Sequence, residues 1–168
     1  MGLYASYTEL TEAQIRDYQA LAEEAKWDFI EALAEDEEVN ETDVDKMWDV
    51  LHFVLTGKSA GDPIEYNALS EFVVGEHNLD DEPFTTYTTP ARVKAIAEAV
   101  NGVDFAKVME NFSIAACAKA DLYPSIWSDE DNEEYEELVG ELTVHFENLK
   151  AFYNDVAARG NAILVMIS

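Results

Sequence analysis

The chain has 168 residues, of which 48% are apolar, and its 36 Asp and Glu side chains against 10 Lys and Arg give a formal net charge of −26. This apolar content excludes an intrinsically disordered acidic chain, and the length suits a single domain over residues 1–168. No apolar run is long enough for a membrane span, and the N-terminal segment lacks the features of a secretory signal. We therefore expect a cytoplasmic protein.

The charge narrows the classes of partner. Nucleic acids and anionic membranes are excluded, because proteins bind them by neutralising phosphates with Lys and Arg. A basic protein partner and mimicry of nucleic-acid charge remain as explanations of the charge, although solvation or a salty environment explains the same charge without any partner. The sequence leaves the oligomeric state open.

Cofactor and metal motifs are missing. The acidic runs at 31–45 and 129–137 do not alternate as in a calcium-binding loop, and no Gly-x-Gly pair occurs. The single cysteine, Cys117, is too few for a structural zinc site. The expectation is a protein without cofactor or metal.

The predicted elements begin with a short strand over residues 3–10. Apolar residues then recur every three or four positions, which predicts one long amphipathic helix from Thr11 to Leu33. A second helix is expected from Thr42, which has Asp45 at the capping-box distance, to a stop at Gly57.

A loop, a short apolar segment and a polar turn over residues 76–83 follow. Residues 84–88 are predicted as a strand, and Thr89-Pro90 predicts the start of a helix that ends at Asn101-Gly102. Two short helices are expected before a break at Tyr123-Pro124.

The C-terminal part completes the predicted fold. A long helix is expected from Glu134 to Gly160, followed by a buried strand at 163–167. These elements predict an α+β fold: a mostly helical single domain with a small sheet of N-terminal, central and C-terminal strands. The unbroken apolar run predicts that the last strand is central. The helices beginning near Thr11 and Glu134 are expected to pack on the sheet through the following residues: Ile15, Phe29, Leu142 and Leu149.

Four side chains are the candidates for chemistry. Asp49 and His52 share a face of the second predicted helix, and Glu76 and His77 lie in the polar turn. Imidazole and carboxylate groups brought together by the fold are suited to acid–base catalysis. The alternative is a capping and solvated role, because such spacing arises by chance on an acidic helix.

The block over residues 45–57, Asp-Lys-Met-Trp-Asp-Val-Leu-His-Phe-Val-Leu-Thr-Gly, resembles a known family. Further matches are the Met1-Gly2 opening, residues 69–77, Tyr123-Pro124 and Gly160-Asn161-Ala162. The chain is similar over nearly its whole length to the YfbM-like proteins, bacterial proteins of unknown function. The resemblance implies a compact single-domain α+β protein and carries neither an activity nor catalytic residues.

Two functional hypotheses follow. The first is a non-catalytic acidic interaction protein, immunity- or inhibitor-like, that binds a basic protein partner. The alternative is a small hydrolase-type enzyme that uses a cluster of Asp49, His52, Glu76 and His77. The position of the two imidazoles relative to a pocket distinguishes these hypotheses.

Overall fold

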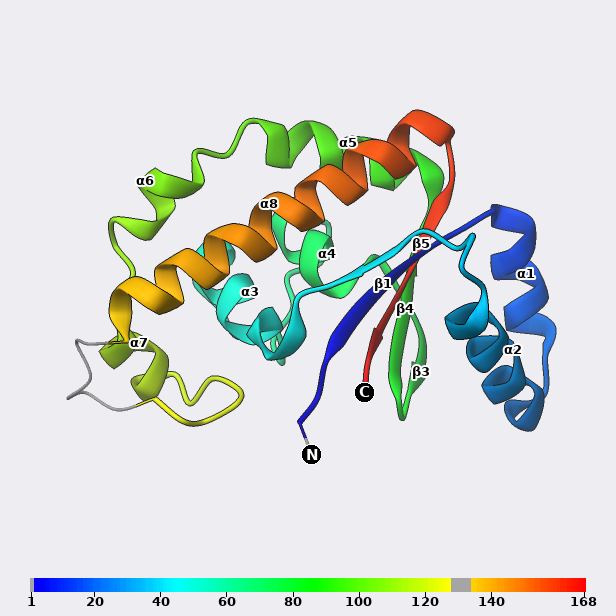
Figure 1. Cartoon of the computed structure of the whole chain (residues 1–168), viewed down its shortest axis with the longest axis horizontal. Helices are drawn as coiled ribbons and strands as arrows, with labels where there is room; N and C mark the ends of the chain where they lie inside the picture. The colour runs from blue at the N-terminus through cyan, green and yellow to red at the C-terminus, as the bar shows by residue number, and fades with distance from the viewer. Residues whose placement is uncertain (1, 128–133) are drawn as a thin grey trace.

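The computed structural model, which describes residues 2–127 and 134–168, contains one antiparallel sheet in the order β2–β1–β5–β4–β3 (Figure 1). The strands are β1 (Ala5–Leu10), β2 (Glu41–Asp43), β3 (His77–Asp81), β4 (Phe84–Thr88) and β5 (Ala162–Ile167). The C-terminal strand pairs with β1 on one side and β4 on the other. Its predicted central position is therefore confirmed, as is the α+β fold.

Every residue of β5 is buried, because helices cover both faces of the sheet. Its odd-numbered residues Ile163, Val165 and Ile167 belong to the larger core, whereas Ala162 and Leu164 belong to a smaller core on the other face. Side chains alternate between the faces of a strand, so a strand covered on both faces must be apolar throughout. This is the physical reason for the unbroken apolar run.

The helices divide between the two faces of the sheet (Figure 1). Helices α1 (Glu12–Ala20) and α2 (Glu23–Glu35) cover the smaller core, where Ile15 and Phe29 pack as predicted. On the other face lie the 3₁₀ turn η1 (Asp45–Met47), α3 (Trp48–Thr56), α4 (Ala68–Val74), α5 (Pro90–Asn101), α6 (Phe105–Met109), α7 (Ile114–Lys119) and α8 (Tyr135–Arg159). Helix α8 packs along α5, and its Leu142 and Leu149 are fully buried in the larger core. In the part of the chain described here, no helix is long and apolar enough to cross a membrane.

The long first helix predicted from Thr11 is wrong, because the chain breaks it at Leu21 and Ala22. Both residues have extended backbone angles, and α1 and α2 run in opposite directions side by side (Figure 1). The fold-back lays Phe29 and Leu33 on the same small core that Ile15 reaches from α1. The three-to-four-residue periodicity continues across the break, so periodicity alone does not reveal it.

Two predicted boundaries are also wrong. Thr42 begins no helix but pairs with Tyr7 as part of β2, and the helix starts at Trp48 after η1. Residues 76–83 contain β3, an edge strand paired with β4, instead of only a turn. In both cases backbone pairing with a neighbouring strand outweighs side-chain polarity, which is tolerated at an exposed sheet edge.

The remaining predicted elements match. Strand β4 spans residues 84–88, α5 begins at Pro90, and two short helices precede Tyr123. Gly57 and Gly160 end their helices with φ of +80° and +69°, a conformation that glycine adopts without strain. In the second acidic run, residues 129–133 lie outside the described residues.

Candidate functional site

Asp49 lies on α3 and is buried, with both carboxylate oxygens occupied. Oδ1 accepts hydrogen bonds from the Ser59 hydroxyl at 2.9 Å and the Ala60 N–H at 2.7 Å. Oδ2 accepts one from the Tyr123 N–H at 2.8 Å. A buried carboxylate needs such donors, and this one fastens two loops to α3.

His52, one turn further along α3, is fully buried and hydrogen-bonded at both ring nitrogens. Nδ1 lies 2.7 Å from the carbonyl oxygen of Lys58, which only accepts, so Nδ1 carries the proton. Nε2 is left to accept a hydrogen bond from the Ser70 hydroxyl at 2.7 Å. Burial lowers the pKa of His52, which favours this neutral ring.

Ser70 connects this buried pair to a cavity of about 570 Å³. The lining of the cavity includes Ser70 from α4, Glu71 and Arg92, whose side chains form an ion pair, and Glu76 and His77 from the start of β3. Asp49 and His52 are not in this lining. The structure thus brings two of the four predicted residues to the cavity. His52 lies behind Ser70, and Asp49 lines a different cavity, next to Trp48 and Ser59.

Glu76 and His77 form one polar unit at the cavity. His77 Nε2 lies 3.1 Å from one carboxylate oxygen of Glu76, and the other oxygen accepts hydrogen bonds from the N–H and hydroxyl of Thr89. Gly75, just before them, has φ of +82°, and a Cβ there would lie 2.0 Å from the Thr86 hydroxyl oxygen. Only glycine lets the chain turn this closely from α4 into β3.

Ser70 and Arg92 are the residues of this region that sequence reasoning did not single out. Ser70 stands in no nucleophile-elbow motif, and nothing in the sequence pairs Arg92 with Glu71, 21 positions away. Over residues 2–127 and 134–168, no group of three or more His, Cys, Asp or Glu side chains is placed to hold a metal ion. Burial raises the pKa of Cys117 to about 11, which disfavours its thiolate form.

A second feature is the acidic arm, which we define as residues 11–40 and which comprises α1, α2 and the turn after them. Ten of its side chains are acidic and two, Arg16 and Lys26, are basic. All ten acidic residues are exposed, and none forms an ion pair with a residue that the structure describes. They are Glu12, Asp17, Glu23, Glu24, Asp28, Glu31, Glu35, Asp36, Glu37 and Glu38.

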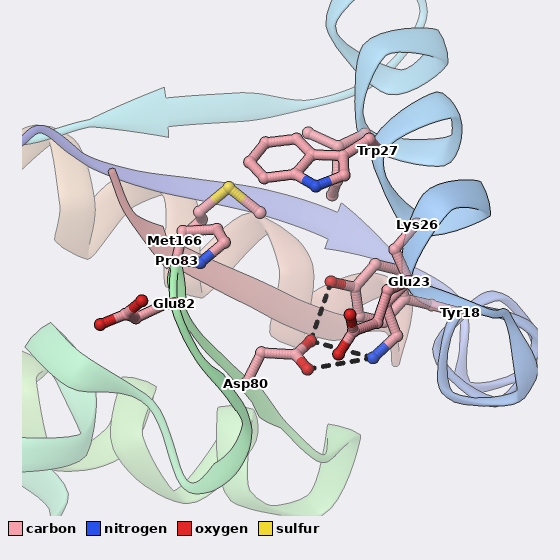
Figure 2. Close-up of a pocket in the computed structure, with 9 residues that line it drawn as sticks. Tyr18, Glu23, Lys26, Trp27, Asp80, Glu82, Pro83 and Met166 are labelled. Carbon is pink, nitrogen blue, oxygen red and sulfur yellow. Dashed lines mark hydrogen bonds and ion pairs between the residues drawn. The ribbon is translucent and has the colours of Figure 1, made fainter.

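An aromatic side chain stands among these charges. Trp27 on α2 is 54% exposed, which is unusual for so large a ring. It borders a pocket of about 100 Å³ between α2 and the β3–β4 hairpin, shown in Figure 2. Pro83 and Met166 also line this pocket, so its walls are partly apolar.

The pocket already holds a cation from the chain itself. Lys26 Nζ lies 3.1 Å from both carboxylate oxygens of Asp80 and 5.3 Å from the centroid of the Tyr18 ring. The Tyr18 hydroxyl donates to Asp80 at 3.3 Å (Figure 2). Burial, aided by the Asp80 charge, raises the pKa of Tyr18 to about 12, so this hydroxyl stays protonated at neutral pH.

Comparisons with known proteins agree over the full length of the chain. The model of a family described as "Domain of unknown function (DUF1877)" matches residues 1–166. Protein YfbM of Escherichia coli (strain K12) is 29% identical over 169 residues, covering 99% of this chain and 99% of that protein. The crystal structure of YfbM from Escherichia coli, titled a protein of unknown function, matches with a TM-score of 0.81 at 27% identity and covers 98% of this chain and 99% of that one. The resemblance to the YfbM-like proteins is confirmed.

Proposed function

This chain belongs to the DUF1877 family, and we propose that it is a non-catalytic interaction protein, immunity- or inhibitor-like, that binds a basic protein through the acidic arm. The observation that carries this proposal is the exposure of all ten arm carboxylates together with the exposed ring of Trp27 on α2. Some carboxylates outside the arm are instead used inside the fold, as with Asp49 and with Glu71 opposite Arg92.

The chain's own cations do not neutralise its surface. Of the ten Lys and Arg side chains, five form ion pairs with residues that the structure describes: Lys26, Lys58, Arg92, Lys150 and Arg159. Against 36 acidic residues, this leaves a strongly negative field. Such a field speeds the encounter with a positively charged protein and makes it salt-sensitive. The partner that satisfies it is a protein with a basic surface.

Trp27 supplies an exposed apolar surface, which charged side chains do not provide. Exposed aromatic rings are frequent hot spots of protein interfaces, because they bury a large apolar area on binding. A ring surrounded by charged groups matches an interface with an apolar centre and a polar rim. The arm therefore combines an electrostatic attraction with a contact that survives at moderate salt.

The test compares two variants with the same change in charge. The arm variant carries Glu24→Lys, Asp28→Lys and Glu31→Lys, and the control carries Glu98→Lys, Glu110→Lys and Glu137→Lys outside the arm, all at exposed positions. Affinity capture from the native lysate at about 150 mM salt is followed by calorimetry with the purified captured protein.

A basic protein that binds the wild type and the control, and that the arm variant or Trp27→Ala loses, supports the proposal. Capture only at low salt, or equal loss in both charge variants, refutes it, because general charge attraction does not distinguish the two surfaces.

The second candidate function is a small hydrolase, favoured by the hydrogen bond between Ser70 and His52. A hydroxyl donating to a neutral imidazole, whose other nitrogen is fixed by the Lys58 carbonyl, is the arrangement of an activated nucleophile. Glu76 and His77 would border the substrate in the cavity. A catalytic role for the predicted cluster that includes Asp49 stays a prediction.

The reaction would be the hydrolysis of an ester. The Ser70 hydroxyl would transfer its proton to His52 Nε2 as Oγ bonds to the carbonyl carbon, and His52 would then protonate the departing alcohol. In the second step, water would transfer a proton to His52 Nε2 as it attacks the carbonyl carbon of the acyl–Ser70 ester. His52 would then return the proton to Ser70 Oγ as the acid departs. Because Ser70 is fully buried, the loop that carries Ile64, whose N–H donates to Ser70 Oγ at 3.0 Å, must first move aside.

A fluorophosphonate probe tests this candidate on the wild-type protein. Mass spectrometry is expected to find one phosphonyl group on Ser70, and none in a folded His52→Gln variant. A wild-type protein that stays unmodified, or that is modified elsewhere, rules the hydrolase out.

A further inference from the structure

We infer that the pocket between α2 and the β3–β4 hairpin receives an arginine side chain of the basic partner. The inference rests on the proposed function, and it names the group that the acidic arm recognises. The pocket lies on the arm's own surface, since Glu23 and Trp27 of α2 line it together with Asp80 of β3 (Figure 2).

The position of Lys26 shows that this pocket stabilises a cation. Its ammonium group is held by both oxygens of Asp80 and lies over the face of Tyr18. Carboxylate and aromatic face are the two surfaces that attract organic cations. The contact of Lys26 with Asp80 and Tyr18 is therefore an example, within the chain, of the cation binding that we infer for the partner's arginine.

One lysine does not neutralise the pocket. Its lining contains three carboxylates, Glu23, Asp80 and Glu82, against the single positive charge of Lys26, which leaves two negative charges. Glu23 and Glu82 form no ion pair with any described residue, and both are exposed. A second cation entering beside Lys26 is therefore favoured by charge.

The shape and walls of the pocket favour arginine over lysine. Figure 2 shows the Trp27 indole on one side of the opening and the carboxylates of Glu23 and Asp80 on the opposite side. A planar guanidinium stacks on an aromatic ring while its N–H groups donate to a carboxylate, whereas an ammonium group is more strongly hydrated and has no flat face. Pro83 and Met166 offer apolar contact to the methylene stem.

The volume of about 100 Å³ limits the ligand to one side chain. A peptide segment or a drug-sized molecule needs a cavity several times larger. The pocket is therefore a subsite within a wider interface, in which the surrounding arm carboxylates attract the partner and the pocket fixes one of its arginines.

The test uses N-acetyl-arginine amide as the probe, with the lysine and citrulline amides as comparisons, at about 150 mM salt. Two-dimensional ¹H–¹⁵N NMR follows the three indole N–H signals of Trp27, Trp48 and Trp127. We expect arginine to shift the Trp27 signal alone and to bind at least about fivefold more tightly than lysine, with no binding of neutral citrulline.

Neighbouring glutamates provide the matched control. Glu23 lines the pocket and Glu24 does not, although both are exposed at the start of α2. Glu23→Gln is expected to weaken arginine binding about fivefold, whereas Glu24→Gln, which removes the same charge, leaves it nearly unchanged.

Equal binding of lysine, shifts of all three indoles, or equal effects of the two glutamine variants would overturn the inference. Loss of pocket binding with capture of a basic partner intact would refute the pocket and leave the proposed function standing. A pocket that binds arginine amide in a protein whose arm captures no partner would refute the proposed function and identify a site for free guanidinium compounds.

Discussion

The central strand makes it possible to compare the two cores by the same kind of truncation. Ile163 and Leu164 are neighbours on β5, with 0% and 2% exposure, and they face opposite sides of the sheet. Ile163 belongs to the larger core, which consists mainly of buried residues, whereas Leu164 belongs to the smaller core, whose α2 residues Phe29 and Ile30 are only partly buried. The cavity left by truncating Ile163 is therefore enclosed by packed side chains, whereas the cavity left by truncating Leu164 can be filled when α2 repacks.

Truncation of Ile or Leu to Ala destabilises proteins by about 2–5 kcal/mol, and the value rises with the cavity that remains. We expect Ile163→Ala to lower the free energy of unfolding by about 4 kcal/mol, because its rigid neighbours cannot collapse, and Leu164→Ala by about 2–3 kcal/mol, because α2 can settle toward the sheet. Both losses are large fractions of the stability of a typical domain.

Urea unfolding followed by far-UV circular dichroism measures both free energies, with equal slopes required for a valid comparison. Val144→Ala, at a position 58% exposed on α8, is the control and should change stability by less than about 0.5 kcal/mol. A loss for Leu164→Ala that equals or exceeds the loss for Ile163→Ala would refute the reasoning that α2 forms the more adaptable layer.

Three further predictions concern the whole chain. Truncation after Gly160 removes the central strand and should abolish cooperative unfolding by circular dichroism; a cooperatively melting product would contradict the architecture. Arg159 and other donors lower the pKa of Glu9 from 4.5 to about 2, so the native state gains stability above pH 4.5 and loses it as pH falls toward 2. The difference in the free energy of unfolding between wild type and Glu9→Gln, measured in urea, should be about 1 kcal/mol at pH 7 after discounting for solvent screening. It should shrink over that pH range, and a constant difference would exclude this linkage. Raising salt from about 10 mM to about 1 M shortens the range of charge repulsion from about 30 Å to about 3 Å, so the melting temperature should rise in calorimetry, and a fall would show that repulsion is not significant.

The parts of the fold that the sequence predicts well have causes within a few residues. Thr89-Pro90 and Gly160 mark helix ends because their backbone preferences are local. The placement of β5 is predictable because burial on both faces leaves a continuous apolar run. Strand β2 is not predicted because its pairing partner, β1, lies far away in the sequence: Thr42 pairs with Tyr7. Strand β3 pairs with the adjacent strand β4, but its side chains are mostly polar, so its sequence looks like a turn.

The candidate sites were less predictable because the sequence shows the acidic residues as one excess, whereas the fold divides them into two kinds. Asp49 and Glu71 are buried and accept hydrogen bonds from donors as far as 74 positions away, so these carboxylates stabilise the fold. The arm carboxylates, by contrast, face water and form no described ion pair. Only charge of the second kind is free to attract a partner, and a charge count cannot separate the two. Composition therefore predicts the chemical class that a partner would have, while the place of the binding surface that we propose depends on which carboxylates the fold leaves exposed.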